Sequence, residues 1–90
     1  MRKQEILDRI NEIIVDEKGQ ALTIDQNFLD SELDSLGVMI VIITLDAEFP
    51  IFKDIPEDDQ IDYLDIPNLT MRDLVAKCRL SITNTDTEQN

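Results

Sequence analysis

Ser35 is the residue of this chain whose type and setting are best suited to chemistry. It lies in the run Asp34-Ser35-Leu36, and the long apolar segment that follows predicts that the serine stands at the N-terminus of a helix. A serine hydroxyl needs an adjacent base to become a nucleophile, and the chain contains no histidine, which excludes a Ser-His-Asp arrangement. A serine that is exposed, flanked by an acid and without a base is suited to be modified. We therefore interpret Ser35 as an attachment point and predict no catalytic residue.

The sequence around Ser35 resembles a known family over most of the chain. Asp34-Ser35-Leu36-Gly37 is similar to the phosphopantetheine-attachment motif of acyl carrier proteins, in which Asp-Ser-Leu opens the second helix. Residues 46–49, 55–59 and 70–75 resemble three later segments of the family, in the same order and at similar spacing. The resemblance spans about residues 3 to 80, and its four segments together are far more specific than the tripeptide alone.

The resemblance implies a non-catalytic carrier protein. A phosphopantetheinyl transferase would move 4′-phosphopantetheine from coenzyme A onto Ser35, with Asp34 and Leu36 positioning the transferase. The thiol of the arm would carry acyl groups as thioesters to acyl-transfer, condensing or ligase enzymes that have basic docking patches. The candidate docking residues are Val38, Ile40, Asp46 and Glu48. Two alternatives stay open, a peptidyl or aminoacyl carrier and an unmodified acidic helical adaptor that binds a basic protein.

The apolar segment 36–45 departs from the family pattern. Positions 37 and 40, where the family commonly has Asp and Glu, hold Gly and Ile. A four-helix domain can bury one face of this helix, so the other apolar side chains need a second explanation. They line an enlarged acyl cavity or lie under the long loop, or they form an apolar docking surface for dedicated partners or a second copy of the chain. This departure suggests a specialised carrier in a lipid or polyketide-type pathway rather than the housekeeping carrier of fatty-acid synthesis.

Charge further limits the choice of partners. The net charge is −12, and residues 19–71 contain twelve acids and one base, Lys53. This composition argues against nucleic acid and anionic membrane surfaces as partners, because binding to either needs clustered Lys and Arg. It favours proteins with basic patches, because opposite potentials steer their encounter. We expect a monomer with at most weak self-association.

Metal sites, disulfides and membrane insertion have little support in the sequence. Asp30, Glu32 and Asp34 alternate like a calcium loop, but the sixth and twelfth positions of that loop hold Ser35 and Val41 instead of Gly and Glu. The single cysteine, Cys78, has no partner for a disulfide and no histidine for a zinc site, so we expect a buried apolar residue. No secretion signal opens the chain and the apolar run is too short to span a bilayer, which predicts a cytosolic protein.

The elements that would position Ser35 are all helical. Apolar periodicity and breaker residues predict a small four-helix, acyl-carrier-like bundle, with three main helices and one short one, over residues 3–16, 35–49, 57–64 and 71–80. Pro50 ends the second helix, and Thr70 caps the fourth with Asp73 in a capping box.

The connections between these helices complete the prediction. Residues 20–33 form a long loop, which we expect Ile24, Phe28 and Leu29 to hold against the helices. Ser31 in this loop also follows an aspartate, but more loop follows it, so it is not the attachment point. The domain spans residues 1–80, and the polar segment 81–90 is predicted to be a disordered tail.

Overall fold

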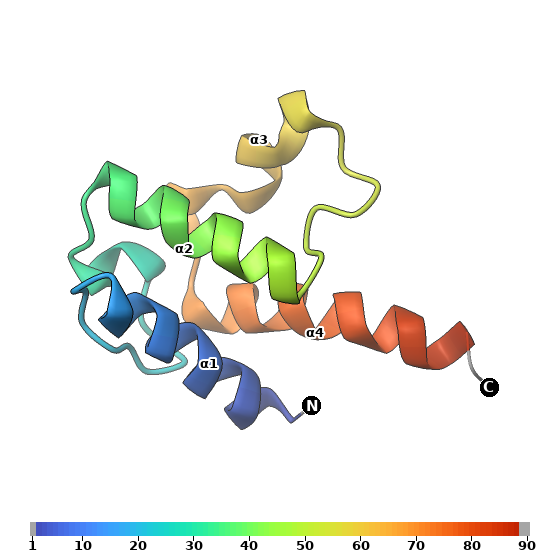
Figure 1. The fold of residues 1–90 in the computed structure, drawn as a ribbon, viewed down its shortest axis with the longest axis horizontal. Helices are drawn as coiled ribbons and strands as arrows, with labels where there is room; N and C mark the ends of the chain where they lie inside the picture. Colours follow the sequence, from blue (N-terminus) through green and yellow to red (C-terminus); the bar gives the residue numbers. More distant parts are fainter. Residues whose placement is uncertain (1, 89–90) are drawn as a thin grey trace.

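Four α-helices build the fold of the described residues, which confirms the predicted all-α class (Figure 1). The computed structural model describes the backbone of residues 2–88 and the side chains of residues 2–82. Within that part of the chain there is no β-strand beyond one isolated bridge. The helices are α1 (Lys3–Asp16), α2 (Ser35–Glu48), α3 (Gln60–Leu64) and α4 (Met71–Glu88), with short 3₁₀ turns η1 (Phe28–Ser31), η2 (Glu57–Asp59) and η3 (Ile66–Asn68).

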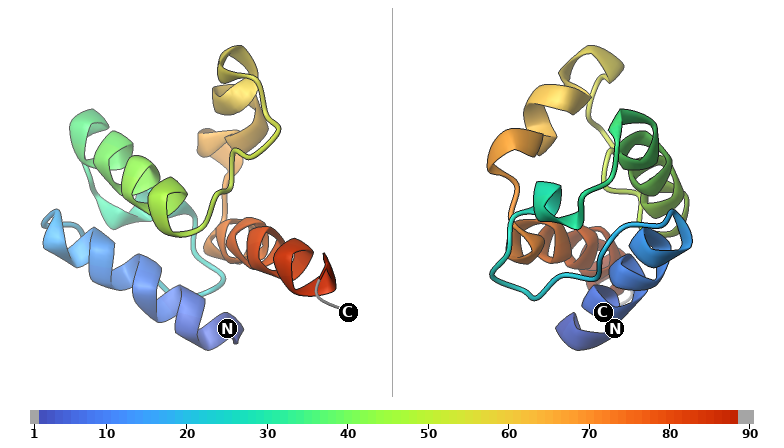
Figure 2. Two further views of the ribbon diagram at one scale, coloured as in Figure 1. Left: turned by 45° about the vertical axis from the view of Figure 1, so that its right-hand side comes forward. Right: turned by 90° about the vertical axis from the view of Figure 1, so that its left-hand side faces the viewer.

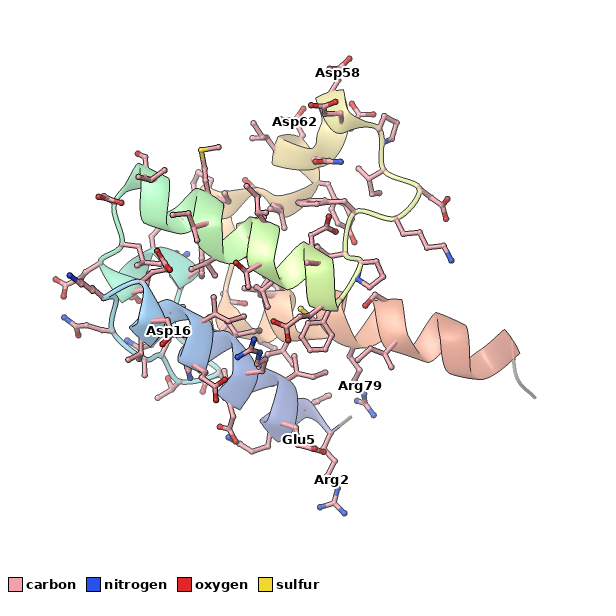
Figure 3. All side chains as sticks on the ribbon, viewed as in Figure 1. Arg2, Glu5, Asp16, Asp58, Asp62 and Arg79 are labelled. Carbon is pink, nitrogen blue, oxygen red and sulfur yellow. The ribbon has the colours of Figure 1, made fainter. Side chains whose placement is uncertain are left out.

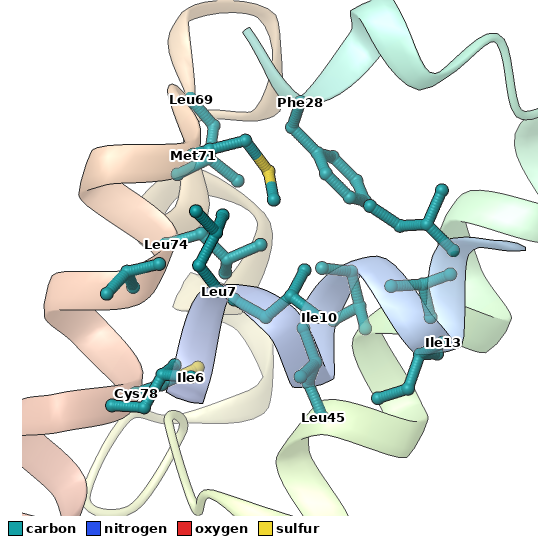
Figure 4. Close-up of a cluster of buried hydrophobic side chains, with 14 of the residues drawn as sticks. Ile6, Leu7, Ile10, Ile13, Phe28, Leu45, Leu69, Met71, Leu74 and Cys78 are labelled. Atoms are coloured by element: carbon teal, nitrogen blue, oxygen red, sulfur yellow. The ribbon is translucent and has the colours of Figure 1, made fainter. Parts of the chain in front are cut away.

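The core forms where α1 packs against both α2 and α4. Apolar residues recur along α1 at intervals of three and four positions, so they line one face of the helix, and that face is buried. Figure 4 shows this face meeting side chains of α2, of α4 and of the loop between α1 and α2. The labelled members of the cluster are Ile6, Leu7, Ile10, Ile13, Phe28, Leu45, Leu69, Met71, Leu74 and Cys78.

The start and end of α2 follow local signals. The Asp34 side chain accepts a hydrogen bond from the Gly37 N–H (2.7 Å), which satisfies one of the unpaired donors of the first turn. The helix ends at Glu48, one residue before the predicted end at position 49, because Pro50 pushes Phe49 into an extended conformation.

The long loop 20–33 is held by specific contacts at two points. The Asn11 side chain makes two hydrogen bonds of 2.8 Å to the backbone of Leu22. Further along, Phe28 donates its N–H to the carbonyl of Leu69 (2.8 Å), and its ring is fully buried. These contacts fix the loop between α1 and the start of α4, so the segment that leads to Ser35 has a defined course.

One of the three residues predicted to hold the loop does not do so. Phe28 is buried and Ile24 packs against the core, as expected, but Leu29 is 46% exposed. Successive residues of a 3₁₀ turn point in directions about 120° apart, so Phe28 and Leu29 in η1 cannot both face the core. Leu33, at the end of the loop, packs against the core instead.

The last helix begins as predicted and ends later. Thr70 and Asp73 form the expected capping box, in which the Thr70 hydroxyl accepts from the Asp73 N–H (3.1 Å). The predicted helix end at residue 80 is wrong, because α4 continues to Glu88. Ile82 lies one turn after the buried Cys78 and packs against the core, so the apolar stripe passes the predicted boundary. Of the predicted disordered tail, residues 89 and 90 lie outside the described part of the chain.

The predicted helix over residues 57–64 consists of η2 followed directly by α3. Figures 1 and 2 show α3 at the opposite end of the molecule from α1, above α2 and α4. Tyr63 connects it to its neighbours, because its ring meets the Phe52 ring at a centroid distance of 6.5 Å and lies 4.3 Å from the Lys77 ammonium. A cation over an aromatic face is attractive, which favours this position of α3.

Candidate functional site

Ser35 is the first residue of α2 and is exposed to solvent. The preceding residue, Asp34, has extended backbone angles, and its carbonyl accepts the N–H of Val38 (2.9 Å), so the helix starts directly at the serine. Within the described part of the chain, no hydrogen bond engages the Ser35 hydroxyl. An exposed, unpartnered hydroxyl at a helix N-terminus is accessible to a second protein.

Gly37 allows the turn before Ser35 to close tightly. A Cβ at this position would lie 3.2 Å from both Leu33 Cδ2 and Asp34 Oδ1, which is closer than ordinary van der Waals contact. Glycine costs about 1 kcal/mol relative to alanine inside a helix, and here it permits Leu33 to pack and Asp34 to cap. The glycine at position 37 therefore has a local structural reason.

The chemistry available to Ser35 is that of an acceptor. Its neighbour Asp34 accepts the Gly37 N–H, the sequence has no histidine, and no base contacts the serine within residues 2–82. Nothing in this arrangement would draw the proton from the hydroxyl. Ser35 can receive a group that another enzyme transfers.

The other serine that follows an aspartate, Ser31, is not accessible to such an enzyme. Ser31 ends η1 and is 0% exposed, and its hydroxyl has no hydrogen-bond partner among the described residues. The α-helix begins four residues later, as the sequence predicts. Ser31 and Ser35 therefore differ in accessibility, although both follow an aspartate.

An apolar cleft begins one helical turn from Ser35. It has a volume of about 290 Å³ and lies between α2 and the segment that contains α3. Positions 38, 39, 42 and 43 follow Ser35 at intervals of three, four, seven and eight, so they share its face of the helix. The lining side chains are Val38, Met39, Ile42 and Ile43 from α2, and Phe52, Gln60, Ile61, Leu64 and Ile66 from the opposite wall.

The apolar run 36–45 is divided among three environments. Val41 and Leu45 are fully buried in the core, and the cleft takes the second set of side chains. Leu36, Met39 and Ile43 are 66%, 58% and 64% exposed, and they form a stripe along the outer side of α2. Features of both sequence interpretations, a lined cavity and an exposed apolar surface, are therefore present on one helix.

The four predicted docking residues have different surroundings on α2. Val38 lines the cleft, and Ile40 is half-buried, with its carbonyl accepting the Thr44 hydroxyl (2.8 Å). The half-buried Asp46 accepts the N–H of Phe52 (3.2 Å), and so it orders the chain after α2.

Glu48, at the far end of α2 from Ser35, has a partner on α1. Both of its carboxylate oxygens accept hydrogen bonds from the guanidinium of Arg9, at 2.8 and 2.6 Å. These bonds lower the pKa of Glu48 and raise the pKa of Arg9. Residues 39 positions apart in the sequence form this pair, and no local signal in the sequence indicates it.

The length of the apolar run 36–45 predicted a cavity lining or a docking surface, but it did not identify which side chains form the site. Met39 and Ile43 belong both to the cleft and to the exposed stripe, while Phe52 and Ile61 supply the opposite wall. The unusual length of the apolar run was the available signal for the α2 residues. No pattern singled out Ile61, because it stands alone between polar neighbours.

The three acids around Ser35 do not converge on a metal site. Asp30 accepts the N–H of Asn27 at the start of η1 (3.2 Å), Glu32 bonds Gln20, and Asp34 caps α2. Among the described residues, no group of three or more metal-ligating side chains could hold an ion.

Within residues 2–88, no helix is long and apolar enough to cross a membrane. No protein-family model matches the chain, and no solved structure matches it significantly.

Proposed function

We propose that this chain is a carrier protein in which 4′-phosphopantetheine is esterified to Ser35. The observation that carries the proposal is the exposed, unpartnered Ser35 hydroxyl at the start of α2, within the motif Asp34-Ser35-Leu36. In the transfer step, the Ser35 oxygen bonds to the phosphorus that bears the pantetheine of coenzyme A. The pyrophosphate bond breaks, adenosine 3′,5′-bisphosphate leaves, and a base of the transferase takes the hydroxyl proton.

The local structure fits a phosphodiester at this position. The N-terminus of a helix carries unsatisfied N–H groups and a partial positive charge, which stabilise a phosphate. The helix α2 is 14 residues long, and Asp34 engages the Gly37 N–H in its first turn. The arm supplies a thiol for thioester formation when it is bound, while the protein supplies the attachment point and the surfaces around it.

The apolar cleft supports the acyl cargo of the proposal. Its α2 wall lies on the same helix face as Ser35, so a short aliphatic group on the arm has an apolar surface nearby. Burying such a group would gain about 25 cal/mol per Å² of apolar surface removed from water. This cleft favours an acyl carrier over the peptidyl or aminoacyl alternative, because a polar aminoacyl group gains less from an apolar wall.

The surface near the cleft suits partner enzymes with basic patches. Exposed carboxylates are concentrated on η2 and α3, where Figure 3 shows Asp58 and Asp62 projecting into solvent. Together with the stripe of Leu36, Met39 and Ile43, they form a surface that is both acidic and apolar. We propose that acyl-transfer, condensing or ligase enzymes of a specialised lipid or polyketide-type pathway in the cytosol dock here. The tether raises the effective concentration of the cargo at each docked active site.

The test is the intact mass of the protein before and after incubation with coenzyme A and a broad-specificity phosphopantetheinyl transferase. We expect a gain of one phosphopantetheine for the wild-type chain and none for Ser35→Ala. Ser31→Ala is the matched control and should gain one arm, because Ser31 is buried. No gain under conditions that modify an established carrier would overturn the proposal and favour the unmodified acidic adaptor.

A further inference from the structure

A second cavity lies on a different side of the molecule, between α1 and α4. Its volume is about 220 Å³, and the loop residue Ile24 closes one side. The apolar lining comes from Leu7, Ile24, Val75 and Ala76, and the polar lining from Lys3, Gln4 and Arg72. None of these residues belongs to the Ser35 site or to the apolar cleft beside it.

The tertiary structure gathers basic side chains around this cavity. Seven of the eight bases lie outside residues 19–71, and the packing of α1 on α4 brings some of them to this cavity. Lys3 and Arg72 line the cavity, Arg2 precedes Lys3, and Arg79 follows Val75 and Ala76 by one turn on the same helix face. Figure 3 shows Arg2 and Arg79 at the edge of the molecule opposite Asp58 and Asp62.

Three carboxylates also lie near this cavity, and one of them, Asp8, accepts a hydrogen bond from the side-chain amide of the lining residue Gln4 (2.8 Å). Arg72 bonds Asp25 at 2.6 Å, and Glu5 accepts the backbone N–H of Arg2 (3.0 Å). The Arg72–Asp25 pair is exposed on both sides, and exposed pairs contribute little to stability. Arg72 can therefore exchange Asp25 for another carboxylate at small cost, whereas Lys3 has no ion pair within the described residues.

We propose that this cavity binds a small amphiphilic anion, an aliphatic carboxylate. The carboxylate would lie between Lys3 and Arg72, and its chain would cover Leu7, Ile24 and Val75. Ligand sites for larger molecules have volumes of roughly 300–1,000 Å³, so a cavity of about 220 Å³ suits a short ligand. In a chain of net charge −12, a cavity with an apolar floor and a basic rim is complementary to this class of ligand. The proposal does not depend on the modification of Ser35.

The test is a titration of the unmodified, ¹⁵N-labelled chain with octanoate, followed by amide chemical shifts. We expect saturable shifts at Leu7, Ile24 and Val75. The double variant Lys3→Gln/Arg72→Gln should bind about tenfold more weakly, because hydrogen bonds to charged groups are among the stronger ones. Lys53→Gln removes a base that does not line the cavity, so this variant should bind octanoate as the wild-type chain does. Neutral octanol should bind to the wild-type chain about tenfold more weakly than octanoate.

Several results would overturn the proposal. Absence of saturable shifts would do so, as would shifts confined to the cleft residues Val38 and Ile42. Equal octanoate affinity in the double variant and the wild-type chain would show that the basic rim does not recognise the carboxylate. The cavity amides could also shift with a peptide that contains Glu and Leu but not with octanoate. That result would identify the cavity as a site for an acidic protein segment.

Discussion

The cap of α2 gives a prediction that joins stability to the candidate site. Replacing Asp34 by alanine removes the 2.7 Å hydrogen bond to the Gly37 N–H and a negative charge at the positive end of the helix dipole. Loss of an N-cap costs about 1 kcal/mol, and loss of the charge costs about 0.5 kcal/mol. The total of about 1.5 kcal/mol corresponds to a decrease in Tm of roughly 6–12 °C for a domain of this size.

Asp34→Asn is the matched comparison for this prediction. Both variants remove one charge from a chain of net charge −12, so any relief of charge repulsion is the same in both. Asparagine can still accept the Gly37 N–H and is as good an N-cap as aspartate. The free energies of unfolding of the two variants should therefore differ by about 1 kcal/mol in urea titrations followed by circular dichroism. Equal stabilities would refute the conclusion that this hydrogen bond holds the start of α2.

The same two variants test the proposed role of Asp34 toward the transferase. If the transferase depends only on the cap geometry, Asp34→Asn should be modified at close to the wild-type rate. If it recognises the carboxylate, both variants should be modified slowly. We expect the second result, because the resemblance to acyl carrier proteins implies that Asp34 positions the transferase. Initial rates followed by intact mass separate the two cases.

Three further predictions concern the core, the thiol and the ion pair. Leu45→Ala should destabilise the protein by about 2–5 kcal/mol, because Leu45 is fully buried. Ile43 is exposed, so Ile43→Ala should destabilise it by less than about 1 kcal/mol. Similar urea midpoints for the two variants would contradict this prediction. Burial raises the pKa of Cys78 to about 12, so a disulfide reagent at about pH 8 should label it only after unfolding, and rapid labelling of the native protein would be the contrary result. Arg9 lowers the pKa of Glu48, so Arg9→Gln should decrease the free energy of unfolding at neutral pH. The difference in unfolding free energy between this variant and the wild-type chain should vanish as the pH falls through the folded-state pKa of Glu48. A difference that persists in strong acid would show that the ion pair is not its origin.

Local signals in the sequence determined most of the fold. The apolar stripe predicted for α1 coincides with the buried face of the helix, because intervals of three and four residues place side chains on one side of a helix. The start of α2 at Ser35 and the capping box at Thr70 were predicted because caps depend on residues within one turn. The end of α4 was not, because contacts with the core, as at Ile82, carry the helix through a polar segment.

For the candidate site, local patterns identified the serine that stands at a helix N-terminus, and the composition shows that no histidine assists it. The surroundings of that serine depend on how the helices pack. The segment 36–45 is apolar on every side, so its periodicity contains no information on which face is buried. Packing against α1 and α3 assigned Val41 to the core, Val38 to the cleft and Leu36 to the surface. Contacts between residues far apart in the chain, such as Arg9 with Glu48, depend on how whole helices are arranged, and local patterns do not contain that arrangement.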